Sequence, residues 1–180
     1  MNFSKPIFSG LSAAFVVGVL ALLTFESPFG VWLMFSFGSS ALILFIFHDS
    51  EFARPKNVFF GHLISIIVGI IFNKYMGVSY ISLGLSVGVC VTLMMYLKIV
   101  HPPAAANPLI AIFADVSYEF ILFPVVSGSI VLIILAYIIN KFILGRKFSK
   151  IKSNLKKQSK SLRKKRKKSR KNTERKEQNY

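Results

Sequence analysis

Five long apolar runs with almost no charged side chains occupy most of the first 144 residues of the chain. They cover residues 7–25, 29–47, 58–76, 78–100 and 120–144. A helix needs about twenty mostly apolar residues to cross the hydrocarbon core of a bilayer, and each run reaches or approaches that length. The runs therefore predict an all-α fold, a polytopic membrane helical bundle with five long spans.

Positive charge is concentrated at the C-terminal end of the chain. Residues 141–180 carry 18 of the 23 Lys and Arg but only two acids, so the whole formal net charge of +16 lies there. A soluble domain keeps about a quarter of its residues charged, whereas this chain has 17% charged and 53% hydrophobic residues. We expect a transmembrane bundle over residues 1–144 and a disordered, basic cytoplasmic tail over residues 145–180.

Residues 99–116 form a sixth apolar segment that three prolines interrupt. It either crosses the membrane or dips in and returns on the same side. Lys and Arg near the ends of spans stay on the cytoplasmic side. With the tail in the cytoplasm, a crossing places four of the five other basic residues inside, and a re-entrant segment places one. We therefore favour six crossings of a cell inner membrane with both termini cytoplasmic.

Small residues recur four positions apart in three of the runs. Such faces let helix backbones approach closely in lipid, where burying apolar surface gains little. Part of this surface could instead support a homo-oligomer, and the sequence leaves both uses open. The three faces are Gly10, Ala14 and Gly18; Gly61, Ser65 and Gly69; and Gly84 with Gly88.

The strongest local motif is HPPAAANPL, which begins at His101. Pro102 and Pro103 stop the preceding helix near Val100, and proline followed by alanines favours the start of a new helix. The N–H groups of the new helix, from Ala104 on, would then form a positive dipole end that suits an anion. His101 and Lys98 could add donors there. The alternative is a structural kink without a ligand.

The remaining polar side chains give weaker signals. His62, inside the third run, either makes a structural hydrogen bond or serves the function. His48, Asp49 and Glu51 could bind a metal from a loop, but solvated loop side chains are the favoured reading. The single cysteine, Cys90, excludes a disulfide framework, and no nucleophile–base set is evident. We expect no enzyme activity, no metal and no cofactor.

Three blocks of the sequence resemble the HPP family of integral membrane proteins. They are FGSSALILF at residues 37–45, ARPKNVFFGH at 53–62, and HPP at 101–103 with an alanine-rich turn after it. The resemblance covers about residues 32–142. On this chain the motif residues of the family are Gly38, Ser40, Pro55, Asn57, His62, His101, Pro102 and Pro103.

The chain also departs from the pattern of the family. Lys56 stands where the family often has Arg, which keeps the charge but not a bidentate fork. Ala105 replaces a glycine, and Asn107–Pro108 replaces a pair of small residues. These changes affect the segment after the break, so the substrate does not follow from the resemblance alone.

The resemblance implies a small helical membrane domain that transports a small anion, since some plastid members are linked to nitrite movement. We hypothesise that Ser40 and His62 face the break at His101 and complete a substrate site with it. Nitrite is the first candidate, and proton coupling through a histidine would raise flux in acid. The candidate substrate-binding residues are Ser40, His62, His101, Pro102, Pro103, Ala104 and Ala105.

The basic tail supports a different kind of partner. Phe148, Ile151 and Leu155 have helical spacing, which favours a short helix on the membrane surface before the disordered part. Each Lys or Arg near an anionic leaflet contributes about 1 kcal/mol, so anionic lipid headgroups are the favoured partner and nucleic acid is the competing one. The alternative function is a non-transporting scaffold whose tail recruits lipid or nucleic acid.

Overall fold

The computed structural model describes residues 4–28 and 30–146 of the chain. These residues belong to the first of two compact units, Met1–Ser149. The predictions for the tail, namely the surface helix, the disorder and the lipid or nucleic-acid contacts, lie outside the described residues.

The described part of the chain is helical and contains no strand. Its α-helices are α1 (Ser4–Glu26), α2 (Ser36–Ile46), α3 (Pro55–Met76), α4 (Tyr80–Tyr96), α5 (Asn107–Phe113) and α6 (Ser127–Ile138). Two short 3₁₀ helices, η1 (Glu51–Ala53) and η2 (Pro102–Ala106), precede α3 and α5. Two π-helical segments, η3 (Ile121–Val126) and η4 (Ile139–Ile143), extend α6 at its two ends.

Three helices of the described part are long and apolar enough to cross a membrane: Pro6–Glu26, Pro55–Met76 and Ile121–Ile143. The second and fourth apolar runs contain α2 and α4, which have only 11 and 17 residues. The prediction of five long helical spans is therefore not confirmed, although the membrane helical bundle is.

The second run is shortened by a non-helical segment before α2. Gly30 has a φ of 106°, which favours glycine. Thr24 Oγ1, near the end of α1, accepts the N–H groups of Trp32 and Leu33 at 3.0 Å each. Because this side chain satisfies backbone donors that a helix would use, the run begins as an irregular segment.

The fourth run is shortened by a C-terminal cap. Lys98 has a φ of 55°, its N–H donates to Met95 O, and the N–H of Ile99 donates to Met94 O. This is the Schellman pattern, in which a left-handed residue closes a helix. The expectation that the proline pair stops the helix near Val100 is thus corrected, since α4 ends at Tyr96.

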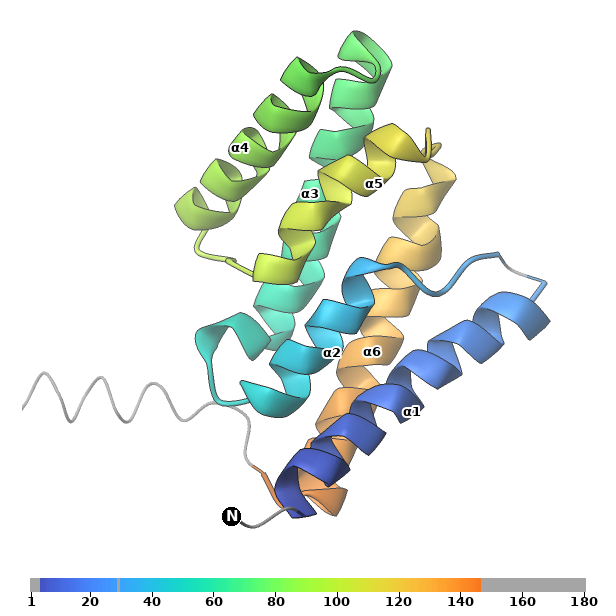
Figure 1. Cartoon of the computed structure of the whole chain (residues 1–180), viewed down its shortest axis with the longest axis vertical. Coiled ribbons are helices and arrows are strands. Elements are labelled where there is room, and N and C mark those ends of the chain that lie inside the picture. The colour runs from blue at the N-terminus through green and yellow to red at the C-terminus, as the bar shows by residue number, and fades with distance from the viewer. Residues whose placement is uncertain (1–3, 29, 147–180) are drawn as a thin grey trace, which may run out of the picture. The chain divides into compact units, whose positions relative to one another are not determined.

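Figure 1 shows how these helices are arranged. α1 begins and α6 ends at the same end of the bundle, and α5 runs back toward the end at which α4 begins. The central helix is α3, which contacts α4, α5, α6, η1 and η2. Whether residues 99–116 cross fully or re-enter stays a prediction.

The small-residue faces differ in use. A Cβ on Gly61 would lie 2.8 Å from His101 Cβ, and one on Gly69 would lie 2.6 Å from Pro108 Cα, so this face of α3 packs tightly against η2 and α5. The other two faces do not serve packing within the described part of the chain, which corrects that expectation. Their glycines, with no atom within 4 Å of an added Cβ, are Gly10, Gly18, Gly84 and Gly88.

Candidate functional site

A cluster of polar side chains lies buried where α2, α3 and the break before α5 meet. Polar groups inside a membrane bundle are costly unless they are hydrogen-bonded, so such a cluster is a candidate functional site. Five of its six members are 0% exposed and Ser36 is 4% exposed. The polar cluster consists of Ser36 and Ser40 on α2, His62 and Ser65 on α3, His101 at the break, and Asn107 at the start of α5.

Ser40 is the centre of the cluster. Its Oγ lies 2.9 Å from Nε2 of His62 and 2.9 Å from Nε2 of His101. The two imidazole rings meet edge to face with centroids 5.0 Å apart, and Phe37 packs against His62 in the same way. The three side chains that the hypothesis places together are therefore in direct contact, and what they bind stays a prediction.

A backbone carbonyl determines the tautomer of His101. Nδ1 of His101 lies 2.8 Å from the carbonyl oxygen of Phe52. A carbonyl oxygen can only accept, so Nδ1 carries the proton and, in the neutral ring, Nε2 must accept. The hydroxyl of Ser40 then donates to Nε2 of His101 at 2.9 Å, in preference to the carbonyl oxygen of Ser36 at 3.1 Å, because no other donor among the described residues reaches Nε2.

The directions of the other hydrogen bonds in the cluster follow from the bond between Ser40 and His101. The only hydrogen of the Ser40 hydroxyl is engaged with His101, so Ser40 Oγ can only accept from His62. Nε2–H of His62 therefore donates to Ser40 Oγ, and Nδ1 of His62 accepts from Asn107 Nδ2 at 3.0 Å. Asn107 Oδ1 in turn accepts from the Ser36 hydroxyl at 2.7 Å. Asn107 Nδ2 also donates to Ser65 Oγ at 2.8 Å. Every polar side chain in the cluster is hydrogen-bonded while both histidines are neutral.

Three members of the cluster are not among the site residues that the sequence predicts. In the sequence, Ser65 belongs to a small-residue face and Asn107 to a departure from the HPP pattern, while no motif includes Ser36. Helical spacing carried a signal, because Ser36 and Ser40 are four apart and His62 and Ser65 are three apart in otherwise apolar helices.

The break itself differs from the expected open helix end. The N–H of Ala104, predicted to be free, donates to His101 O at 3.0 Å. Pro103 and Ala104 are buried, Ala105 is half-buried and Pro102 is exposed. Helix α5 has only 7 residues, so its dipole is small. The side chains of the polar cluster, rather than the backbone donors, therefore carry the chemistry at this place.

Comparison with known proteins agrees with this architecture. The family model described as "HPP, transmembrane region" matches residues 1–149. The chain belongs to the HPP family. It is accordingly a multi-pass membrane protein in contact with the lipid bilayer.

Two curated relatives of this HPP protein are transmembrane proteins of Dictyostelium discoideum. One is 30% identical over 152 residues, which are 78% of this chain and 49% of the relative. The other is 29% identical over 121 residues, which are 63% of this chain and 42% of the relative. The chain thus spans about half the length of the curated relatives it matches or less. No solved structure matches it.

The other motif residues of the HPP pattern lie around the cluster. Asn57 is buried, and its Nδ2 donates to the carbonyl oxygens of Glu51 and Val100 at 3.0 and 3.2 Å. It thereby ties the segment that carries Phe52 to the residue before His101. Pro55 is the first residue of α3, where its missing N–H costs nothing. Gly38 is exposed, with no atom within 4 Å of an added Cβ.

Two basic candidates lie outside the cluster. Lys98, which was expected to add charge at the break, is exposed. Lys56, in place of the Arg that the HPP family often has, is exposed in the first turn of α3. Neither side chain contributes to the chemistry of the buried histidines.

A surface groove reaches one end of the polar cluster. Its volume is about 560 Å³, and Ser36, which bonds Asn107, lies in its wall. The wall is mainly apolar, with the hydroxyls of Ser36 and Ser39 as its polar side chains. The groove is lined by Phe35, Ser36, Ser39, Ala106, Leu109, Ile110, Phe113 and Ala114.

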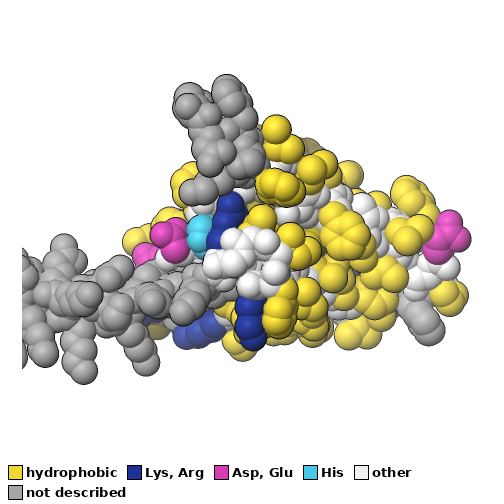
Figure 2. Space-filling model, turned by 90° about the horizontal axis from the view of Figure 1, so that it is seen from below, with side chains coloured by type: hydrophobic (Ala, Val, Ile, Leu, Met, Phe, Trp, Pro, Cys, Tyr) yellow, Lys and Arg dark blue, Asp and Glu magenta, His cyan; other side chains and the backbone are white. Residues whose placement is uncertain are grey.

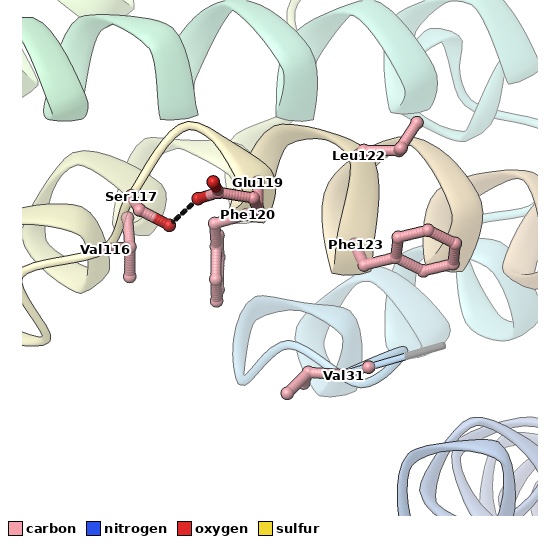
Figure 3. A pocket seen from close by; sticks show the side chains of 8 residues that line it. Val31, Val116, Ser117, Glu119, Phe120, Leu122 and Phe123 are labelled. Atoms are coloured by element: carbon pink, nitrogen blue, oxygen red, sulfur yellow. Dashed lines mark hydrogen bonds between the residues drawn. The ribbon is translucent and has the colours of Figure 1, made fainter. Parts of the chain in front are cut away.

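A second hollow lies apart from the polar cluster, and none of the six cluster residues lines it (Figure 3). Its volume is about 510 Å³. Ser117 donates to the carboxylate of Glu119 at its edge, and this hydrogen bond lowers the pKa of that carboxyl. The lining residues are Gly30, Val31, Val116, Ser117, Glu119, Phe120, Leu122 and Phe123.

The loop after α2 contains the third histidine. Figure 2 shows a histidine beside acidic and basic side chains at the end of the bundle where α1 begins. Burial and the nearby Arg146 guanidinium, in that order, lower the pKa of His48, against the opposing charge of Asp49. Residues 4–28 and 30–146 contain no group of three or more His, Cys, Asp or Glu able to hold a metal, so His48, Asp49 and Glu51 do not form one.

Proposed function

We propose that this HPP protein transports a small monovalent anion together with a proton, and that nitrite is the first candidate substrate. The single observation that carries the proposal is the position of Ser40 Oγ, 2.9 Å from Nε2 of two fully buried histidines in a membrane bundle. Ionisable side chains inside a membrane are rare, and proton-coupled transporters use them as relays.

The neutral cluster has no spare donor for an anion, because each N–H and O–H is already used. One added proton gives the pair of rings a positive charge that the neutral cluster lacks, and this charge attracts an anion. All five acidic side chains of the described residues are exposed, so no carboxylate in that part of the chain neutralises the charge inside the bundle. A buried charge without a partner is costly, and a monovalent anion would remove that cost.

Proton and anion would therefore bind together and move together as a neutral pair. Nitrite suits such a site because it is small, carries one charge and accepts hydrogen bonds through oxygen. The groove beside Ser36 supports an approach route, since its apolar wall with two hydroxyls suits a small solute without net charge.

The proposal extends to the setting of the protein. We place the bundle in a cell inner membrane with both termini in the cytoplasm, where the basic tail would contact anionic lipid headgroups. The unused glycine faces of α1 and α4 leave room for a homo-oligomer.

The test is anion flux in proteoliposomes, with nitrite, nitrate, formate and chloride measured against protein-free vesicles between pH 5 and 8. We expect saturable nitrite flux that rises as pH falls and is lost in His101→Ala. His48→Gln is the matched control, since His48 lies in a loop outside the cluster, and its flux should equal that of the unchanged protein. Absence of flux for all four anions with folded, inserted protein would overturn the proposal, and so would nitrite flux independent of pH.

A further inference from the structure

We propose that His101, and not His62, takes up the proton, and that rotation of the Ser40 hydroxyl toward the carbonyl oxygen of Ser36 accommodates it. The role in transport rests on the proposed function. The assignment itself rests on the hydrogen bonds of the two rings and can be tested without transport.

A proton on His101 leaves every group of the cluster satisfied. Nδ1 continues to donate to the carbonyl oxygen of Phe52, and Nε2 now donates to Ser40 Oγ. Ser40 Oγ has two lone pairs, so it accepts from Nε2 of both rings. The O–H bond of Ser40 then turns away from His101, and the hydroxyl donates to the carbonyl oxygen of Ser36, which lies 3.1 Å away. Only a hydroxyl hydrogen has to move.

A proton on His62 has no such solution. It would have to occupy Nδ1, which faces the Nδ2 donor of Asn107 at 3.0 Å, so two donors would oppose each other. Asn107 would have to turn its amide over, which would also reverse its bonds to Ser36 and Ser65. Three groups would rearrange inside a close-packed interior.

Asn107 is therefore a positioning residue. Its amide nitrogen keeps Nδ1 of His62 in the accepting role, and the Ser36 hydroxyl keeps that amide in its orientation. His62 then acts as a fixed donor to Ser40, and His101 is the ring that changes charge. The two histidines have different roles although they share one hydroxyl.

Charged groups on the neighbouring elements do not change which of the two histidines is protonated first. Glu51 on η1, Lys56 on α3 and Lys98 after α4 are exposed, and Arg54 before α3 is half-buried. Within the described residues, none of these side chains has a hydrogen bond to the cluster, and α2 and α5 contain no charged residue. The hydrogen-bond pattern thus decides which ring is protonated.

The experiment is ¹⁵N NMR of the full chain in lipid nanodiscs with ¹⁵N-labelled histidine rings. The chain has three histidines, and His48→Gln removes one signal set for assignment. At neutral pH we expect the Nδ1–H tautomer for His101 and the Nε2–H tautomer for His62. On acidification, Nε2 of His101 should shift from the unprotonated to the protonated position while His62 is still neutral. Protonation of His62 first, or the same tautomer in both rings, would overturn the assignment.

Asn107→Asp provides a second test with a side chain of nearly the same shape. A carboxylate only accepts, so Nδ1 of His62 should now carry a proton and His62 should show a protonated Nδ1 signal at neutral pH. An unchanged His62 tautomer in folded Asn107→Asp protein would contradict the positioning role. Expected tautomers without anion flux would reject the proposed function alone, whereas pH-dependent flux with His62 protonated first would reject this inference alone.

Discussion

Gly61 lies so close to His101 that a Cβ atom on the glycine would be 2.8 Å from Cβ of the histidine. Such a distance leaves no space for a side chain, and His62, the next residue of α3, contacts the same ring. The glycine therefore allows the break and the central helix to approach closely enough for Ser40 to bond both histidines.

Gly61→Ala should destabilise the bundle and disturb the site. Overpacking of this kind costs about 1–3 kcal/mol, because η2 must move away from α3. We expect a lower midpoint of thermal unfolding in detergent and a reduced nitrite flux. Gly84→Ala is the matched control, since no atom lies within 4 Å of an added Cβ there. Equal unfolding midpoints for the two variants would show that the close approach of Gly61 to His101 does not contribute to the stability of the bundle.

Ser40→Ala should uncouple the two rings. Nε2 of His101 would lose its donor and Nε2 of His62 its acceptor, and an unsatisfied buried polar group costs about 1–3 kcal/mol. We expect nitrite flux to fall by about tenfold or more, which corresponds to roughly 1.4 kcal/mol in the barrier. Ser86→Ala is the control, because this buried serine bonds within α4, to Leu83 O. Full flux in Ser40→Ala vesicles would remove Ser40 from the mechanism.

Asn57→Ala should loosen the connection between the segment of Phe52 and the break. The carbonyl oxygens of Glu51 and Val100 would both lose a donor, and we expect a loss of about 1–3 kcal/mol in unfolding free energy. Asn73→Ala removes an exposed hydrogen bond to Asp115 and should cost much less. Thermal or denaturant unfolding of the two variants side by side measures the difference, and a larger loss for Asn73→Ala would refute the bridging role.

The loop histidine should contribute a pH dependence to stability. The pKa of His48 is lowered in the fold from its ordinary 6.5, so the unfolded chain binds the proton more readily. Its contribution is therefore fully present above pH 6.5 and is lost as pH falls below it. We expect His48→Gln to show a smaller decrease in unfolding midpoint between pH 7 and pH 5 than the unchanged protein. A steeper decrease in the variant would contradict the sign.

Removal of the tail separates transport from a scaffold function. A chain ending at residue 149, where the family match ends, should retain nitrite flux if the bundle is the transporter. A scaffold that acts through its tail would lose its function on this truncation and would tolerate His101→Ala. Flux lost on truncation and kept in His101→Ala would therefore favour the scaffold.

Much of the helical architecture could be predicted from the amino-acid sequence. Membrane helices follow from long apolar runs, since backbone polar groups in lipid must be satisfied within the helix. The lengths of α2 and α4 could not be predicted in this way. They depend on Thr24, whose hydroxyl accepts the N–H groups of Trp32 and Leu33, and on the left-handed backbone of Lys98. Both are local exceptions that an apolar pattern does not reveal.

The residues of the candidate site also fall into two groups, those that the sequence indicated and those that only the tertiary structure brought together. The sequence by itself indicated His62 and His101, because ionisable side chains inside apolar helices are uncommon and the proline pair marks the break, and the resemblance to the HPP family added Ser40. Only the tertiary structure brought Asn107 to His62, across 45 residues, and joined it to Ser36, across 71. The direction of all these bonds depends on the carbonyl oxygen of Phe52, 49 residues from His101. Every residue has such a carbonyl, so no sequence pattern could single out this one.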